Sequence, residues 1–228
     1  ILFGGSRESR QSEIDHLIIT ETRNSTGFAK SGITVYYTNS YFVSLETVLS
    51  INYYDTYPTG TPFPTQNKIF GEAILQDAYD TESKSVKSLP TASFVKNIND
   101  DRWTKNYTFY DKRGRAIGSH STNHLGGNTI VHSRLDFTGT VYKTKTYNKR
   151  INAELPVVVE EKFEYDDQKK LVKHYHQVLG KTPQELLAEN TYNELGQLTQ
   201  KKVGNNLQTI NYNYNIRGWM TGINLLNG

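Results

Sequence analysis

The stretch Tyr192-Asn193-Glu194-Leu195-Gly196-Gln197-Leu198 has the pattern of two strands joined by a tight turn. An aromatic residue ends the first strand, and an Asn-Glu pair enters the turn. Gly196 can take a positive φ without a Cβ clash, and Leu198 begins the return strand. The stretch therefore predicts a β-hairpin in which Tyr192, Asn193 and Gly196 are the residues that the turn needs.

The same pattern recurs four more times in the second half of the chain. The copies begin at residues 110, 135, 165, 192 and 214, with Leu135 in place of Tyr and Lys169 in place of Gly in one copy each. A bounded period of this size is typical of repeated hairpin units. We expect a structural role for Tyr110, Asp111, Gly114, Asp136, Gly139, Tyr165, Asp166, Tyr192, Asn193, Gly196, Tyr214, Asn215 and Gly218.

Side chains two residues apart on a strand share a face, so the repeats also predict aromatic contacts. Tyr165 should share a face with Phe163, and Tyr212 with Tyr214. We expect these rings to form aromatic ladders across neighbouring strands.

These residues resemble the YD repeats of Rhs-type proteins, whose core is a Tyr-Asp pair followed by a Gly-Arg-Leu-like return. Segments 189–198 and 212–220 are especially similar to Rhs-like proteins of the Bacteroidetes. The clear match runs from about residue 106 to residue 224. The stretch Ile51-Asn52-Tyr53-Tyr54-Asp55 resembles, more weakly, the segment that often precedes such repeats.

The resemblance implies an all-β fold of successive antiparallel hairpins that form part of a spiralling β-sheet shell. Residues 1–105 would be a β-rich segment that precedes the clear repeats and belongs to the same shell, and residues 106–228 the YD-repeat segment. In many family members the shell encloses a C-terminal toxin, and other members act at cell surfaces in contact and adhesion. The implied partners are therefore neighbouring repeats and an enclosed domain of the same polypeptide, in a secreted or cell-surface bacterial protein.

Self-cleavage sites in the family contain Asp-Pro, which is absent from this sequence, so no catalytic residue is carried over. The chain also has no Cys, which excludes a disulfide framework and a thiolate metal site. The net charge of +3 is spread along the chain and does not favour nucleic acid or membrane insertion. An alternative function follows from the 16 tyrosines, whose exposed rings could bind carbohydrate or a cell-surface partner.

The chain begins at Ile1 and contains neither a secretion signal nor an apolar run long enough to span a bilayer. We expect it to be an interior piece of a longer polypeptide, with any export signal outside it. Secretion machinery and cell-surface glycans are the further partners that we consider.

The first part of the chain predicts strands at residues 17–22, 33–37 and 48–54 from its β-branched and aromatic content. Residues 24–32 have the composition of a turn. Three prolines predict a loop over residues 57–67, and we favour an irregular loop over a short helix within residues 69–88.

Candidate chemical sites are few. His120 and His124 would share one helix face but lie in a loop-like stretch, whereas His174 and His176 should share one face of a strand. The pairs at 100–101 and 166–167 put adjacent carboxylates on opposite faces of a strand, which suits turn chemistry better than catalysis.

The sequence contains no nucleophile elbow and no phosphate-binding loop, and the Lys pairs are typical of a solvated sheet. We therefore expect no catalytic residue, no metal and no cofactor. The residues that could contradict this expectation are His120, His124 and His132, which could converge if the sheet curls.

Overall fold

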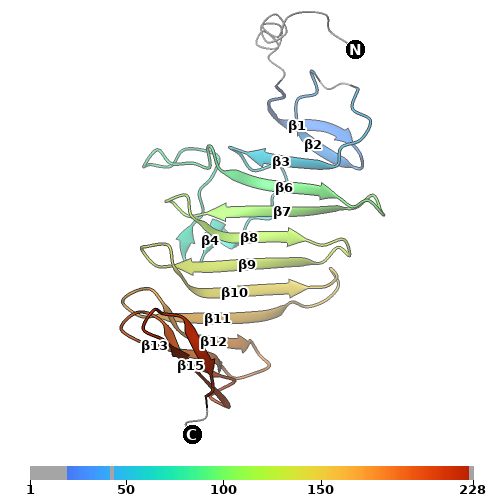
Figure 1. Ribbon diagram of the computed structural model, residues 1–228. Helices are drawn as coiled ribbons and strands as arrows, with labels where there is room; N and C mark the ends of the chain where they lie inside the picture. Colours follow the sequence, from blue (N-terminus) through green and yellow to red (C-terminus); the bar gives the residue numbers. More distant parts are fainter. Residues whose placement is uncertain (1–19, 42–43, 226–228) are drawn as a thin grey trace, which may run out of the picture.

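The computed structural model describes residues 20–41 and 44–225, which form an all-β fold. Twelve strands form one antiparallel sheet in the order β16-β15-β14-β13-β12-β11-β10-β9-β8-β7-β6-β3, and two short hairpins, β1-β2 and β4-β5, lie outside it (Figure 1). The predicted architecture of successive antiparallel hairpins is confirmed, and the sheet does not close into a barrel. No helix in the described residues is long and apolar enough to span a membrane.

The strands are β1 (Arg23–Lys30), β2 (Ile33–Tyr37), β3 (Ser50–Tyr54), β4 (Lys68–Ile69), β5 (Glu72–Ala73), β6 (Pro90–Lys96), β7 (Trp103–Tyr110), β8 (Ala116–Thr122), β9 (Asn128–Leu135), β10 (Val141–Lys149), β11 (Val157–Tyr165), β12 (Leu171–Val178), β13 (Glu185–Tyr192), β14 (Leu198–Val203), β15 (Gln208–Tyr214) and β16 (Met220–Ile223).

Every repeat hairpin has the same register. The residue at the Tyr position pairs with the residue six positions after it. The residue just before the Tyr position pairs with the residue eight positions after the Tyr position. One extra residue therefore lies on the return strand, which is a β-bulge that bends the strand and increases its twist. The pairs at the Tyr position are Tyr110 with Ala116, Leu135 with Val141, Tyr165 with Leu171, Tyr192 with Leu198, and Tyr214 with Met220.

A sixth copy of this hairpin lies upstream of the five that the sequence indicates. Tyr54 pairs with Pro90, and the residue before Tyr54 pairs two positions beyond Pro90, which is the same bulge. The backbone N–H of Asp55 donates to the carbonyl of Leu89 at 3.2 Å, as in the other turns. Residues 56–88 are therefore an insertion within one turn of the repeat array.

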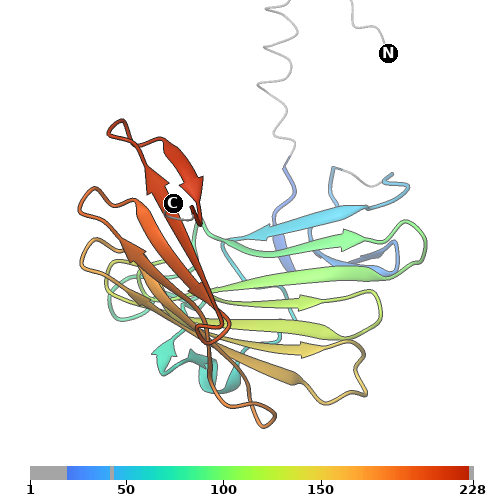
Figure 2. The same cartoon turned by 60° about the horizontal axis from the view of Figure 1, so that its bottom comes forward.

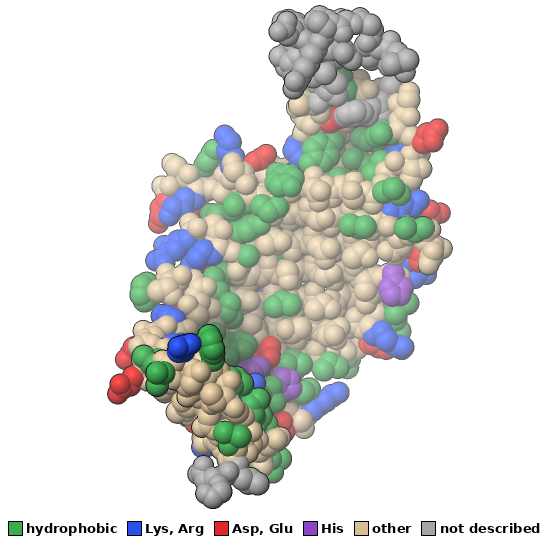
Figure 3. All heavy atoms as spheres, viewed as in Figure 1, with side chains coloured by type: hydrophobic (Ala, Val, Ile, Leu, Met, Phe, Trp, Pro, Cys, Tyr) green, Lys and Arg blue, Asp and Glu red, His purple; other side chains and the backbone are tan. Residues whose placement is uncertain are grey.

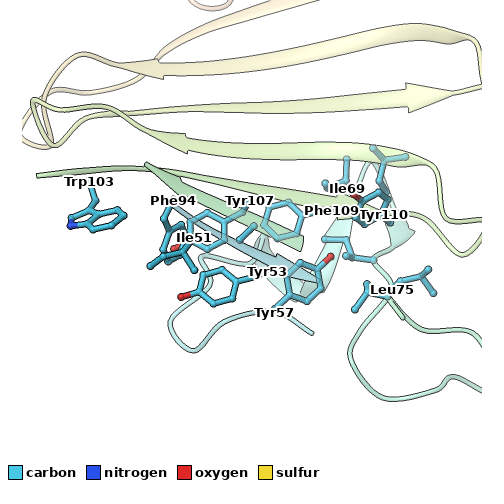
Figure 4. Close-up of a cluster of buried hydrophobic side chains, with 14 of the residues drawn as sticks. Ile51, Tyr53, Tyr57, Ile69, Leu75, Phe94, Trp103, Tyr107, Phe109 and Tyr110 are labelled. Atoms are coloured by element: carbon cyan, nitrogen blue, oxygen red, sulfur yellow. The ribbon is translucent and has the colours of Figure 1, made fainter. Parts of the chain in front are cut away.

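The insertion covers one face of the sheet and forms the core with it. Ile69, Leu75 and Val86 from the insertion are buried with Tyr53 and Phe109 from the sheet (Figure 4). As expected from the prolines, residues 57–67 are a loop, with a single 3-10 turn at Thr65–Asn67. The remainder is irregular apart from the two-residue strands β4 and β5, as the sequence predicts. We call this side of the sheet the insertion face.

The β1-β2 hairpin also packs against the insertion face. The Tyr37 and Tyr53 rings stack at 5.4 Å, and the Trp103 indole donates to the Ser31 carbonyl at 3.0 Å. The turn predicted at residues 24–32 is wrong, because β1 occupies most of it. Asn24 does bond backbone N–H groups two and three residues later, so its turn chemistry forms an irregularity inside the strand.

Two predicted strands upstream of the repeats are confirmed, namely 33–37 as β2 and most of 48–54 as β3. The strand predicted at 17–22 falls largely outside the described residues, and residues 20–22 do not form a strand. The boundary expected between residues 105 and 106 falls inside β7, and strands on both sides of it pair in one sheet.

The opposite side of the sheet, which we call the open face, is polar. One row of directly paired residues crosses six strands on this face, and its members are Asn52, Ser93, Asn106, Ser121, Thr129 and Asn148. Figure 3 shows this face, where polar uncharged side chains and backbone dominate the middle of the sheet.

The sheet curves toward the open face. In Figure 1 the last hairpins lie in front of the sheet and β4 lies behind it. Figure 2 shows β13 to β16 rising on the side of the sheet away from the insertion. The open face is therefore concave and the insertion face is convex.

Candidate functional site

The repeated turns form a row along one edge of the sheet, which we call the turn edge. In each turn the Asp or Asn after the Tyr position closes the loop through its side chain. Asp111 is typical, because its Oδ1 accepts hydrogen bonds at 2.9 Å from the backbone N–H groups of Arg113 and Arg115. Asp136, Asp166, Asn193 and Asn215 accept the equivalent bond from the residue four positions later.

The Gly position of each turn has the left-handed conformation that the sequence predicts. Gly114, Gly139, Gly196 and Gly218 have φ between +73° and +95°. Lys169 occupies the same position with φ +62°, which costs a residue with a Cβ on the order of 1–2 kcal/mol.

Neighbouring turns also contact each other at this Gly position. A Cβ on Gly139 would lie 3.8 Å from the Arg115 side chain, and one on Gly196 would lie 2.5 Å from Lys170 Nζ. In the turn that precedes Lys169, Thr140 occupies the position equivalent to Arg115 and Lys170, and its side chain is short. We infer that the small Thr leaves the space that the Lys169 side chain uses.

The tyrosines link one hairpin to the one before it. In four copies the hydroxyl donates to the backbone carbonyl of the first residue of the preceding strand. These bonds run from Tyr110 to Pro90 at 2.6 Å, Tyr165 to Val141 at 2.8 Å, Tyr192 to Leu171 at 2.9 Å and Tyr214 to Leu198 at 2.9 Å. Leu135 cannot make this bond, which distinguishes its copy from the others.

The expected aromatic ladders are wrong. Among the described residues, no contact between two aromatic rings involves Tyr165, Tyr192 or Tyr214, and Phe163 stacks on His174 at 4.6 Å instead. Repeat tyrosines stand two strands apart, about 9–10 Å, which exceeds the separation of contacting rings. The residues directly opposite them are aliphatic or Pro.

Charged side chains connect three consecutive turns, at residues 111–115, 136–140 and 166–170. Burial acts to raise the pKa of Asp111, but hydrogen bonds from Arg115 and two backbone N–H groups outweigh it and hold this pKa below its ordinary value. The Arg115 guanidinium pairs with Asp111 at 2.6 Å and also donates to the Asp136 carbonyl at 2.8 Å. Lys169 from the next turn holds the pKa of Asp136 well below its usual range. These contacts tie three consecutive turns together.

A recess lined by aromatic side chains lies on the insertion face. It has a volume of about 490 Å³ and lies between the loop at residues 62–68 and strands β7 to β10. Phe63, Phe109 and Tyr147 contribute rings, and His120 and His132 contribute imidazoles. Burial lowers the pKa of both histidines, so both rings are predominantly neutral near pH 7.

The structure separates the three histidines that the sequence brings forward. His120 and His132 line the same recess. His124 lies in the turn at residues 123–127 on the other edge of the sheet, where its carbonyl accepts a hydrogen bond from Arg102. That turn is closed by Asn123 in the manner of the repeat turns. No group of three potential metal-binding side chains is present in residues 20–41 and 44–225.

His174 and His176 share the open face, as the strand pattern predicts. Glu161 on β11 lies directly opposite His176, and its Oε1 lies 2.9 Å from His174 Nε2. Thr144 donates to the other carboxylate oxygen at 3.1 Å. Sequence reasoning missed Glu161, because only the cross-strand register brings it to these histidines.

No model of a known protein family matches the chain, and no curated protein matches it.

Proposed function

We propose that the chain is a wall segment of a YD-repeat β-shell of the Rhs type, which encloses or presents a passenger domain of the same polypeptide. The observation that carries the proposal is the constant register of six hairpins. The same bulge at the same place in each hairpin adds the same bend and twist, so further copies would continue one curved surface. A wall built this way needs no chemistry of its own.

The two ends of the sheet support this role. Within the described residues, β3 pairs only with β6, and β16 pairs only with β15. An unpaired edge strand exposes a row of N–H and C=O groups that favours pairing with another strand. Neighbouring repeats on both sides would satisfy these groups and extend the wall.

The composition of the concave open face suits the inner surface of a shell. The central row of Ser, Thr and Asn side chains on this face presents hydrogen-bonding groups. A passenger chain would find little apolar surface to bury there, so it would be enclosed without being tightly bound. We therefore assign the open face to the interior of the shell and the insertion face to its exterior.

The absence of Cys allows a direct test with single introduced cysteines. Thr146→Cys places a thiol on the open face, and Lys145→Cys places one on the insertion face of the same strand, β10. Both variants are made in the 228-residue chain and in the longest natural polypeptide that contains it. Each is treated with a small maleimide and with a bulky polymer-linked maleimide.

In the 228-residue chain both thiols should react with both reagents. In the long polypeptide, Thr146→Cys should resist the bulky reagent and Lys145→Cys should react with it. Equal reactivity of the two thiols toward the bulky reagent in the long polypeptide would refute an enclosed open face.

A further inference from the structure

The recess on the insertion face has the build of a small-ligand site. Phe109 forms the floor of the recess and is fully buried. The Phe63 ring lies at the rim, and its centroid is 5.7 Å from that of the Phe109 ring. Tyr147 borders the recess from β10 and contacts the His132 ring at 5.6 Å. Its volume falls within the range of cavities that bind small molecules, which are mostly apolar with a few placed polar groups.

One polar atom at this place lacks a partner. His132 Nε2 is buried and makes no hydrogen bond within the described residues. A buried imidazole nitrogen without a partner costs free energy, and a ligand that bonds it recovers that cost. The Tyr147 hydroxyl also makes no hydrogen bond to the described residues, so a second polar group is free to bind.

The character of these groups restricts the ligand. A neutral imidazole has one donor and one acceptor nitrogen, and a phenol hydroxyl can do both. Such groups match hydroxyls, which also donate and accept. Lys68 is the one cation among the described residues that line the recess, and it is exposed, so a carboxylate or phosphate would gain only one solvent-screened ion pair there. A purely apolar ligand would leave the His132 nitrogen unpaired. Flat aromatic rings beside the polar groups suit the apolar C–H face of a sugar ring.

We propose that this recess binds a neutral pyranose ring at the end of a glycan. The rings of Phe63 and Tyr147 pack against the C–H face of the sugar, and its hydroxyls bond His132 and His120. The site lies on the convex face, which is opposite to the face assigned to the shell interior. It therefore does not depend on whether the chain encloses a passenger.

The experiment follows the imidazole resonances of the chain by NMR during titration. The chain has only six histidines, so each can be assigned. The titrants are glucose, galactose, N-acetylglucosamine and their disaccharides, with glucuronate and inorganic sulfate as anionic probes. At least one neutral sugar should shift His120 and His132 with a Kd on the order of 1 mM, while His174 and His176 stay unchanged.

Variants of the rim test the stacking. Phe63→Ala should weaken binding at least tenfold, and Phe63→Leu should also weaken it, because Leu keeps the contact with Phe109 but has no flat ring. Phe137→Ala is the matched control, because Phe137 is exposed on the turn edge, away from the recess. This variant should bind the sugar as tightly as the parent. The imidazole resonances of the unliganded variants show that each has folded.

Three results would overturn the proposal. The first is that no neutral sugar shifts His120 or His132. The second is that only glucuronate or sulfate shifts them, which would indicate an anion site. The third is that folded Phe63→Leu binds as tightly as the parent.

Discussion

The hydrogen bond from Tyr165 to the Val141 carbonyl should be a measurable link between consecutive hairpins. Tyr165→Phe removes only the hydroxyl and keeps the ring. Burial raises the pKa of Tyr165, which agrees with a hydroxyl shielded from water. One hydrogen bond of this kind contributes about 0.5–1.5 kcal/mol net, and an acceptor left buried without a partner adds to the loss. Val141 is half-buried and water can replace part of the bond, so we expect a loss of about 1 kcal/mol.

Urea unfolding followed by far-UV circular dichroism measures this loss. The matched control is Tyr175→Phe on the neighbouring strand β12, because the Tyr175 hydroxyl makes no hydrogen bond within the described residues. The control should change the free energy of unfolding by no more than a few tenths of a kcal/mol. Because a repeat array can unfold in parts, amide hydrogen exchange in β10 and β11 provides a local measurement.

In that measurement, exchange in Tyr165→Phe should be about fivefold faster than in the parent, which corresponds to about 1 kcal/mol. Equal effects of the two substitutions, or none from Tyr165→Phe, would show that the hydroxyl does not hold the hairpins together.

Three further predictions concern packing and pH. Gly118→Ala should lower the free energy of unfolding by about 1–3 kcal/mol, measured by heat or urea, because the new Cβ would lie 2.2 Å from Ile69 Cδ1. Gly126→Ala is the control, since nothing lies near a Cβ placed there, and it should lose only the roughly 1 kcal/mol that a positive φ costs. A lowered folded-state pKa of Asp111 means that its stabilisation is present above about pH 4 and is lost as the pH falls through the folded value. Asp111→Asn should therefore flatten the acid limb of the stability curve below about pH 4, and an unchanged slope would contradict the buried ion pair. The pKa of His132 is also lowered, so its neutral form stabilises the fold above about pH 6.5 and the contribution is lost below it. His132→Gln should reduce the loss of stability as the pH falls below about 6.5, as measured by the same unfolding curves.

The sequence predicts well what depends on neighbours along the chain. The positive φ of Gly196 and the side-chain bonds of Asp111 follow from local turn chemistry, and both are observed. The hairpin order follows as well, because short turns leave consecutive strands no alternative to antiparallel pairing. Asn24 shows the limit of local chemistry, since its turn-like bonds form within a strand that β2 pairs with.

Features that depend on register could not be predicted. Glu161 reaches His174 only because β11 and β12 pair with a particular offset. The hydrogen bond from the Tyr165 hydroxyl to the Val141 carbonyl likewise depends on how β10 and β11 are aligned. The sixth hairpin was hidden because Tyr54 and Pro90 are far apart in the sequence. Nor does any periodicity indicate which face of the sheet residues 56–88 cover, which decides where the recess forms.

The opened turn after Tyr54 shows that this scaffold tolerates long additions at the turn edge. Residues 55–89 connect the two strands of this hairpin, as residues 111–115 do in a regular copy, yet the strand register is the same in both. Closing a loop about seven times longer costs only about 1.7 kcal/mol, and the added residues recover more than this by burying their own apolar side chains. Each remaining turn is thus a site where evolution, or a protein engineer, can graft a module of new specificity without disturbing the strands that carry it.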